Sequence, residues 1–515
     1  FDFDLLRFTS TRFDLRHMSY FLKTKKLDIE TGSGLIAILN EKEAEHLGIH
    51  PGDRVTLNYG KKKKVTVTID TSQKLVKPGY IGLFEDVWEK RVIKEDEVAQ
   101  MVVESRPLSI ETLKKKMLGK PCSYDEFYAL IKDISDGKFS EIETTYYAAS
   151  GFVAPYTDQE LYYVAKAMAE TGEQFNLKQK VVDKHSVGGL AGNRSTPIII
   201  SIIASLGVTI PKTSSRAITS PAGTADAMEV LCPVSFSLPE IKKIVKKTNG
   251  CLVWGGGLRM APADDKIIQV SRPLAVESYD KMIVSIMAKK VATGVDYLVI
   301  DIPVGESCKV PNMKHANAIE KKFIALGKKF KMKVKVIKTP AKEPIGRGIG
   351  PALEAREVLR VVQQHKFRSL DLENKACKLA GAILELKGYC KSGNGYKIAK
   401  GQVKNGEAWQ KLNQIIVAQG GEDDINSEEV IKEVEKYEIH AKKSGKIHFV
   451  NNKNINEVCM NLGAPIDKNA GIHTHVRYGQ KVKKGDKLYT MYTSSADRLK
   501  LGKLAAAKNI IFNIK

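Results

Sequence analysis

Two glycine-rich loops carry the side chains that could bind a phosphate-containing ligand. The first loop (residues 184–196) reads Lys-His-Ser-Val-Gly-Gly-Leu-Ala-Gly-Asn-Arg-Ser-Thr, and the second loop (residues 213–226) reads Thr-Ser-Ser-Arg-Ala-Ile-Thr-Ser-Pro-Ala-Gly-Thr-Ala-Asp. Glycines let backbone N–H groups approach an anion, hydroxyls donate hydrogen bonds, and lysine or arginine supplies positive charge. Neither loop matches the Walker pattern or the dinucleotide-binding fingerprint. Because both loops are basic and rich in hydroxyls, we predict two phosphate cradles rather than two plain turns.

The chain around these loops predicts a parallel α/β layer. The apolar runs 298–302 and 334–337 indicate strands, and the helical run 312–328 lies between them. Strand, helix and strand in this order are typical of a parallel sheet. The longest apolar run, 197–210, is shorter than the roughly 20 residues of a membrane span and contains serine and glycine, so we expect a buried helix or strand there.

The rest of the chain predicts further domains. Its 515 residues, 43% apolar and 27% charged, indicate a soluble protein of three or four domains. Alternating strands at 54–58 and 65–69 indicate a small β-barrel, and a capping box from Thr157 to Glu160 opens one of several helices that precede the first loop. The fold class expected is therefore multi-domain α/β. Its divisions are an extension or tail over 1–17, an N-terminal β-barrel over 18–101, a helical domain over 105–180 with contributions from later helices, an α/β phosphate-binding domain over 181–365, a helical connection over 366–439, and a β-rich C-terminal α+β domain over 440–515.

The net charge indicates which ligands the protein could attract, and the cysteines and first residues indicate its cellular compartment. The formal net charge is +23, which attracts anions such as nucleotides, phosphorylated metabolites or nucleic acid, although lysine runs such as 61–64 are typical of a solvated surface. The seven cysteines include no Cys-x-x-Cys pair, which argues against a zinc ribbon or a disulfide framework. The first residues contain no apolar segment of the signal-peptide type, so we expect a cytoplasmic protein.

Three motifs together resemble a known enzyme family. Lys184-His-Ser-x-Gly-Gly189, Ser-Ser-Arg-Ala-x-x-x-x-Ala-Gly-Thr-x-Asp at 214–226, and Ser285-Ile-Met-Ala-Lys-Lys290 resemble the thymidine and pyrimidine nucleoside phosphorylases. The additional N-terminal barrel and the phrases at 210–220 and 253–256 are most similar to the archaeal AMP phosphorylase branch. The resemblance covers the chain from about residue 18 to the C-terminus.

The resemblance implies a fold, a reaction and a set of partners. It implies a site in the cleft between the helical domain and the α/β domain, where inorganic phosphate attacks ribose C1′ of a nucleoside 5′-monophosphate, adenine leaves and ribose 1,5-bisphosphate forms. Two phosphate groups near one ribose would explain the need for two cradles. The partners implied are a nucleotide and inorganic phosphate as co-substrate, with no metal, no other cofactor, no nucleic acid and no membrane. The assembly implied is a homodimer, with larger homo-oligomers left open.

The resemblance also assigns site residues by position. The positions that match phosphate-binding residues are Lys184, Ser186, Thr196 (or Ser195, because this loop is one residue longer than in the pyrimidine enzymes), Ser214 and Thr224. The positions that match AMP-binding residues are Gly189, Ser215, Arg216, Ala217, Ile218, Thr219, Ser220, Thr224, Ser285 and Lys309. Lys309 follows a predicted strand, where open α/β sheets place ligands.

The proton donor implied by the resemblance is Glu277, where the AMP enzymes carry an aspartate. Adenine leaves readily only when it is protonated, and a general acid typically contributes a factor of about 100–10,000. Glutamate is a competent acid, but its carboxyl lies one methylene further from the backbone. The alternative is a surface charge after a structured segment.

Other polar motifs are assigned structural roles. Asp226 and Glu229 are expected to hold the second loop in place, and Asp264-Asp265 to be solvated or capping residues. His473 and His475 would share one face of a strand as a potential metal pair, but no third ligand is evident nearby. His185 could either contact the ligand or orient its loop, and the sequence leaves both roles open.

Three competing functions remain at this stage. A thymidine or uridine phosphorylase would need an arginine seven positions before Glu277, where this chain has Val270. A phosphoribosyltransferase of the anthranilate type would need a magnesium-binding acidic motif, which is not evident. A basic RNA-binding protein is compatible with the net charge, but aromatic residues are only 7% and no aromatic–basic motif occurs. Base preference among AMP, CMP and UMP stays open.

Overall fold

The computed structural model describes residues 19–31, 34–103, 107–217, 220–271, 278–432 and 434–515. It divides into two compact units, the first within Phe1–Glu111 and Asp136–Ser140 and the second within Thr112–Ser135 and Glu141–Lys515. The chain passes from one unit to the other within helix α3 (Ile110–Met117).

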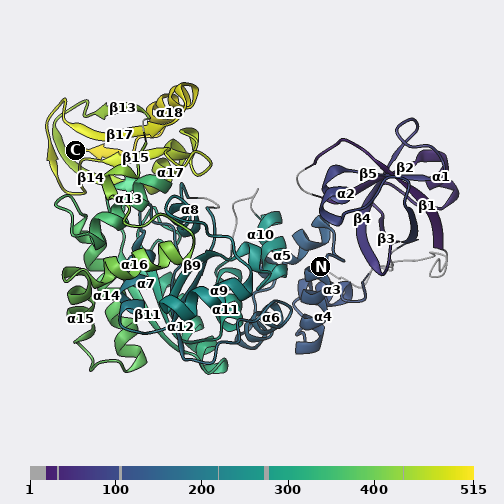
Figure 1. The fold of residues 1–515 in the computed structure, drawn as a ribbon, viewed down its shortest axis with the longest axis horizontal. Coiled ribbons are helices and arrows are strands. Elements are labelled where there is room, and N and C mark those ends of the chain that lie inside the picture. The colour runs from purple at the N-terminus through teal and green to yellow at the C-terminus, as the bar shows by residue number, and fades with distance from the viewer. Residues whose placement is uncertain (1–18, 32–33, 104–106, 218–219, 272–277, 433) are drawn as a thin grey trace, which may run out of the picture. The chain divides into compact units, whose positions relative to one another are not determined.

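The first unit contains a closed β-barrel (Figure 1) with the strand order β1-β5-β2-β4-β3-β6. Its elements are β1 (Ser19–Lys26), β2 (Ile36–Asn40), α1 (Glu41–His46), β3 (Arg54–Tyr59), β4 (Lys63–Ser72), β5 (Tyr80–Leu83), α2 (Glu85–Arg91) and β6 (Val98–Val103). The predicted alternation is clear in β4, where Val65, Val67 and Ile69 are buried in the barrel and Thr66 and Thr68 are more exposed. The predicted strands 54–58 and 65–69 are confirmed.

A group of helices forms one part of the second unit. It comprises α4 (Tyr124–Ser135), α5 (Glu141–Val153), α6 (Asp158–Glu170), α10 (Pro262–Ser271) and α11 (Tyr279–Thr293). Helix α6 contacts α4 and α11, and α10 contacts α5, so later helices do join the helical segment. The capping box predicted from Thr157 and Glu160 is present at the start of α6, where each residue bonds the backbone N–H of the other.

Five parallel strands form the centre of the second unit. They are β7 (Val181–Ser186), β8 (Ile210–Ser214), β9 (Gly250–Trp254), β10 (Val295–Val304) and β11 (Lys333–Pro340). Strands β11, β10 and β7 form one parallel sheet, β8 and β9 form a second, and a parallel bridge from Val181 to Thr209 joins the two. The mixed α/β class predicted from the sequence is confirmed, and the predicted strands at 298–302 and 334–337 lie within β10 and β11.

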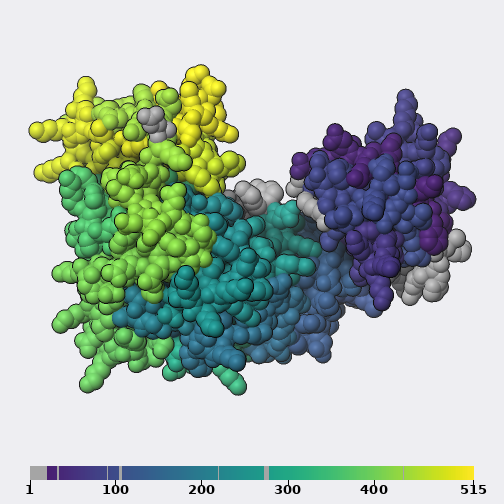
Figure 2. Space-filling model, in the orientation of Figure 1, coloured from purple at the N-terminus to yellow at the C-terminus, as the bar shows by residue number. Residues whose placement is uncertain are grey.

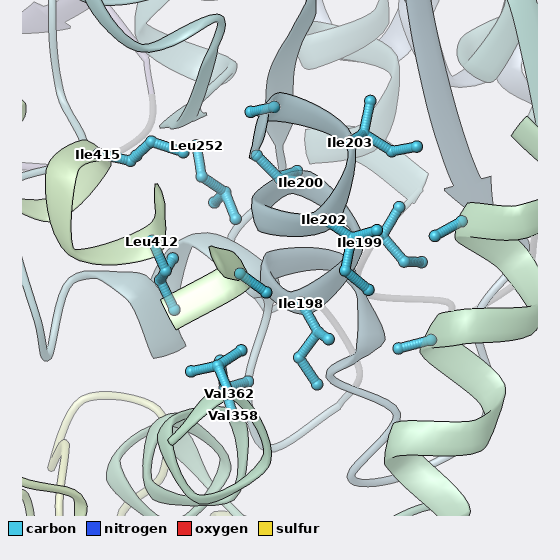
Figure 3. Close-up of a cluster of buried hydrophobic side chains, with 14 of the residues drawn as sticks. Ile198, Ile199, Ile200, Ile202, Ile203, Leu252, Val358, Val362, Leu412 and Ile415 are labelled. Atoms are coloured by element: carbon cyan, nitrogen blue, oxygen red, sulfur yellow. The ribbon is translucent and has the colours of Figure 1, made fainter. Parts of the chain in front are cut away.

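The apolar run beginning at Pro197 forms most of helix α7 (Ser195–Ser205), and the chain then reaches β8 after Gly207, whose φ is +72°. Isoleucines on every side of α7 are buried (Figure 3) among residues of β9, α13 and α16. A helix that is apolar all round must be buried on all sides, which explains its central position. The remaining helices of this part are α8 (Thr224–Met228), α9 (Leu238–Thr248), α12 (Met313–Lys329), α13 (Pro351–Val362), α14 (Leu370–Lys387), α15 (Gly395–Lys404) and α16 (Glu407–Ala418), with short 3₁₀ turns at Gly256–Leu258 and Ser427–Glu429.

The segment 366–439 differs from the expected helical connection. Helices α14, α15 and α16 contact α7, and their apolar side chains belong to the same core as those of α7. They are therefore a layer of the α/β body rather than a link after it, because the buried helix α7 needs apolar partners on several sides.

The C-terminal part has its own core and an α+β composition. Its elements are β13 (Glu435–His440), β14 (Gly445–Val450), α17 (Asn452–Asn461), β15 (Gly471–Thr474), β16 (Lys481–Val482), β17 (Lys487–Thr493), α18 (Ala496–Lys508) and β18 (Phe512–Ile514). One sheet runs β12-β15-β17-β13, and its first strand, β12 (Gly348–Ile349), comes from the α/β part. The yellow C-terminal residues consequently rest against green residues of the same unit (Figure 2), and α13 contacts β15.

Candidate active site

The two glycine-rich loops leave neighbouring parallel strands at their carboxyl ends. The first loop continues from β7, the second loop continues from β8, and Lys309 lies in the loop after β10. A Cβ atom added to Gly189 would lie 2.5 Å from the backbone nitrogen of Lys309, so these two predicted site residues are in close contact. The carboxyl ends of strands are the usual ligand-binding edge of an open α/β sheet. The structure therefore brings the predicted cradles together at that edge.

Lys184 is the most buried cation of the first loop. Only 1% of the residue is exposed, and its Nζ lies 3.4 Å from both Ser195 Oγ and Thr196 Oγ1 at the start of α7. Burial lowers the pKa of Lys184 to about 8, while the carboxylate of Asp301 acts in the opposite direction. An ammonium group next to two hydroxyls can stabilise a bound anion, and both hydroxyls are buried together with the lysine.

A buried acid lies on the strand residue before Lys184. Asp183 is 1% exposed and pairs with Lys290 of α11 at 2.6 Å and with Lys212 of β8 at 3.4 Å. Burial alone would raise the pKa of Asp183, but Lys212 and Lys290 outweigh it and hold the pKa below its usual value. One carboxylate thus pairs with two buried lysines. Burial lowers the pKa of Lys212 to about 7, although Asp183 acts in the opposite direction.

Ser186, a predicted phosphate ligand, donates its hydrogen bond to a protein carboxylate in this structure. Its Oγ lies 3.0 Å from Asp301 Oδ2, and Asp301 also accepts from Thr339 and pairs with Lys375 at 3.0 Å. Burial would raise the pKa of Asp301, but Lys375 and Lys184 lower it overall, so the acid is ionised. The Ser186 hydroxyl must rotate away from Asp301 before it can donate to a ligand.

The second loop is held by the acids that the sequence assigned to that task. Asp226 accepts hydrogen bonds of 2.7 Å from the backbone nitrogens of Ala217 and Gly223. Glu229 pairs with both terminal nitrogens of Arg216 and, at 2.7 Å, with Lys468 from the C-terminal part. The hydrogen bonds from Arg216 lower the pKa of Glu229 to about 2.

The Arg216 side chain contacts residues that hold the second loop in place. Besides its pairing with Glu229, its guanidinium lies 5.0 Å from the ring centre of Trp254. Ser214 and Ser220 direct their hydroxyls to nearby carbonyl oxygens, at 3.4 Å from Ser215 O and 3.1 Å from Ala222 O. In this structure the Arg216 side chain therefore shapes the second loop.

Arg194 connects the two loops and is not among the predicted site residues. Its guanidinium donates to Thr224 Oγ1 at 2.5 Å and to Ala222 O at 2.9 Å, and it pairs with Glu354 of α13 at 2.6 Å. Its position inside a predicted phosphate loop was the only sequence feature that pointed to a role in the site. Its partner Glu354 is 160 residues away in the sequence, so the pairing could not be predicted.

Ser285 lies on α11 and contacts the helical part of the second unit. Its Oγ donates to Asp264 Oδ2 at 2.7 Å, and Lys289 pairs with the same carboxylate oxygen at 2.6 Å. Asp264 is 3% exposed, so the solvated alternative is wrong for it, while both acids lie in the first turn of α10. Burial raises the pKa of its neighbour Asp265 to about 6. Helix α11 also carries Lys290, which links Ser285's helix to β7 through Asp183.

His185 is held in its neutral form. Burial lowers the pKa of His185 well below its usual value, and the charges of Lys290, Lys212 and Lys184 lower it further. A neutral imidazole can donate or accept one hydrogen bond per nitrogen but cannot attract an anion by charge. Its role in the site stays open.

Three predicted site residues, Ile218, Thr219 and Glu277, lie outside the described residues.

The two histidines of the potential metal pair in the C-terminal part contact other side chains. Arg356 lies 3.3 Å from His473 Nδ1, and His475 forms a hydrogen bond of 2.8 Å with Thr490. In the part of the chain that the structure describes, no cluster of three or more His, Cys, Asp or Glu side chains could hold a metal ion. Within the same residues, no helix combines the length and apolar character of a membrane span.

The lowered pKa of Lys184 predicts how phosphate affinity depends on pH. A bound phosphate favours the ammonium form, so the contribution of Lys184 to affinity, taken as the ratio of wild type to Lys184→Gln to remove the titration of phosphate itself, should be constant well below pH 8 and weaken by about tenfold per pH unit well above it. Titration calorimetry with inorganic phosphate between pH 6.5 and 9.5 measures this. The variant Lys184→Gln should bind weakly and without that pH dependence, and an equally steep dependence in the variant would contradict the assignment.

Two family models match parts of the chain. Residues 178–409 match the family model "Glycosyl transferase family, a/b domain", and residues 446–513 match "Pyrimidine nucleoside phosphorylase C-terminal domain". A Thermus thermophilus anthranilate phosphoribosyltransferase structure covers 60% of this chain and 98% of its own, with a TM-score of 0.48 and 17% identity, a likeness that carries no further inference.

Full-length relatives are more informative than these segments. The AMP phosphorylase of Thermofilum pendens is 41% identical over 479 residues, which cover 93% of this chain and 92% of the relative. The AMP phosphorylase of Methanocaldococcus jannaschii is 40% identical over 482 residues, covering 93% and 95%. The resemblance inferred from the loop motifs is thereby confirmed, and the chain belongs to the AMP phosphorylase family.

Proposed function

We propose that the protein is a pentosyltransferase that cleaves AMP with inorganic phosphate, giving adenine and ribose 1,5-bisphosphate. The observation that carries the proposal is the pairing of two polar glycine-rich loops at the carboxyl ends of β7 and β8, in a chain that matches AMP phosphorylases over 93% of its length. A phosphate oxygen attacks ribose C1′, the bond from C1′ to adenine N9 breaks, and the bonding electrons leave with the base.

The loops would bind two anions of one reaction complex. Lys184, with Ser195 and Thr196, would hold the attacking phosphate, and the second loop with Lys309 would hold the nucleotide. The excess lysines around Asp183 support this assignment, because two phosphate groups close together repel each other unless fixed positive charge surrounds them. Ser285 on α11 would face the ligand from the helical part, as the cleft in the expected fold requires.

A homodimer and a cytoplasmic location complete the proposal. Both rest on the family resemblance, and the location also rests on the cysteines, which are all unpaired and mostly buried. Inorganic phosphate is a co-substrate, and the reaction as proposed uses no metal, since lysine, arginine and N–H donors can neutralise the phosphates.

The proposal is tested by assaying free base from several substrates. Purified protein is incubated with phosphate and AMP, CMP, UMP, adenosine or thymidine, and the bases are separated by chromatography. Adenine release from AMP that depends on phosphate, with little from adenosine, is expected. Release from nucleosides alone would contradict the nucleotide assignment and restore the pyrimidine or nucleoside phosphorylase alternative.

The general acid is tested by variants of Glu277. Glu277→Gln should lower kcat by about 100–10,000-fold, because glutamine cannot protonate adenine, while the KM for phosphate stays within a few fold. Glu277→Asp, which introduces the aspartate that the family resemblance implies at this position, is the matched control and should retain activity. Equal kcat values for the wild type and Glu277→Gln would remove Glu277 from the mechanism.

A further inference from the structure

Arg194 makes a contact between the two loops whose direction is fixed by chemistry. A guanidinium has five N–H donors and no acceptor, so Thr224 Oγ1, at 2.5 Å from Arg194 Nη1, must accept this hydrogen bond. The single hydroxyl hydrogen of Thr224 therefore points away from Arg194. It remains available to an acceptor on the other side of the oxygen.

The hydroxyls of Ser195 and Thr196 also accept, from Lys184 Nζ at 3.4 Å, but two other site hydroxyls behave differently. Ser186 and Ser285 lie beside the carboxylates of Asp301 and Asp264, and a carboxylate can only accept. Their hydrogens are therefore taken by the protein. Thr224 is the reverse case, because its neighbour is a donor and its hydrogen is left over for a ligand.

We propose that Arg194 is a positioning residue for anion binding, which fixes the Thr224 hydroxyl as a hydrogen-bond donor to phosphate in the site. The inference rests on the proposed function in so far as the two loops bind phosphate. It adds a residue that acts through Thr224, not one that binds the anion in its place.

The contacts of Arg194 explain why it positions Thr224 and does not bind the anion itself. Nε and Nη2 both lie 2.6 Å from Glu354 Oε2, Nη2 also donates to Ala222 O, and Nη1 donates to Thr224. Four of the five donors are thus engaged by the protein. Its charge is balanced by Glu354, which is 1% exposed and accepts a further bond from Gly350 N at 3.2 Å.

The same contacts tie the loops to each other. Arg194 belongs to the first loop, Ala222 and Thr224 to the second, and Glu354 to helix α13 behind them. A rigid planar fork that bonds all three holds the Thr224 oxygen at a set place relative to Ser195 and Thr196, which follow Arg194 directly. A lysine has the same charge but a single flexible point of donation, so it cannot reproduce the arrangement.

The test measures binding of inorganic phosphate to the full-length protein by titration calorimetry, with no nucleotide present. Arg194→Lys keeps a positive charge against Glu354, and thermal melting checks that it folds. It should bind phosphate about tenfold more weakly than the wild type and show a matching rise in the KM for phosphate. Arg368→Met is the matched control. It removes an arginine–glutamate pair of 2.8 Å elsewhere in the second unit, and it should leave phosphate affinity unchanged.

A double-mutant cycle with Thr224→Val separates positioning from a general structural role. Because Arg194 acts through the Thr224 hydroxyl, Arg194→Lys should change phosphate affinity by less than twofold once that hydroxyl is absent. Wild-type phosphate affinity in Arg194→Lys, or independent effects that multiply in the double variant, would overturn the proposal. A further double variant, Arg194→Met/Glu354→Leu, removes the arginine and its partner carboxylate together. It should also weaken phosphate binding.

Failure of the positioning role of Arg194 can be told apart from failure of the proposed reaction. If the wild type binds phosphate but releases no adenine from AMP, the proposed reaction fails and the Arg194 cycle still decides its own question. If adenine is released but the Arg194 and Thr224 effects are independent, the positioning role alone fails.

Discussion

Replacing Lys184 with glutamine is expected to lower kcat/KM for phosphate by about 100–1,000-fold, the effect typical of removing one preorganised donor from a site. Lys184 is 1% exposed and lies beside two hydroxyls, so the variant removes a desolvated positive charge that water cannot replace. Steady-state kinetics with phosphate as the varied substrate provide the measurement.

The stability of the Lys184→Gln variant provides an independent check. Burial lowers the pKa of Lys184 to about 8, which means that folding disfavours its charged form at pH 7. The variant should therefore melt at or above the wild-type temperature while losing activity. Lys116→Gln is the matched control, since Lys116 is also buried but pairs with Glu160 at 3.0 Å, and it should reduce stability with little change in phosphate KM. A Lys184→Gln variant with full activity would contradict the assignment.

Replacing Asp183 with asparagine is expected to have the largest effect on stability, about 3–5 kcal/mol in the free energy of unfolding. The carboxylate is 1% exposed and pairs with Lys290 and Lys212, so its loss leaves two buried amines without a counter-charge, of which Lys212 already has a pKa lowered by burial to about 7. Urea unfolding followed by circular dichroism measures the change. The double variant Asp183→Asn/Lys290→Met should recover part of the loss.

The pH dependence of this effect follows from the pKa of Asp183, which lies below its usual value. A lowered acid pKa stabilises the fold above the unfolded pKa of about 3.9, and the contribution disappears as pH falls through the folded pKa. The wild type and Asp183→Asn should therefore differ most above about pH 5. Asp497→Asn, which removes an exposed ion pair of 3.0 Å with Lys500, should stay within about 0.5 kcal/mol of the wild type. A similarly small change for Asp183→Asn would contradict the buried-pair interpretation.

Local sequence signals predicted local structure well. Thr157 and Glu160 specify a helix start by hydrogen bonds three residues apart, and the alternation of Val65, Val67 and Ile69 specifies a strand with one buried face. The apolar run 197–210 could not be assigned to helix or strand, because a segment buried on all sides has no polar face to reveal its period. Likewise, nothing local shows that α14–α16 pack on α7.

In the candidate site too, local features were predictable from the sequence and long-range contacts were not. Glycines, hydroxyls and basic residues within two short loops predicted the cradles, and the contact of Gly189 with Lys309 agrees with the placement of both residues in one site. Arg194 and Asp183 were missed because their roles depend on partners more than 100 residues away, Glu354 and Lys290. Pairings of that kind arise only when the sheet and helices assemble.

The identity of the products tests the central claim most directly. The protein is incubated with AMP and ¹⁸O-labelled inorganic phosphate, and the sugar products are analysed by mass spectrometry. We predict ribose 1,5-bisphosphate that carries the label and forms in equal amount to adenine. Ribose 5-phosphate as the only sugar product, or adenine release at the same rate without phosphate, would show hydrolysis and contradict phosphorolysis.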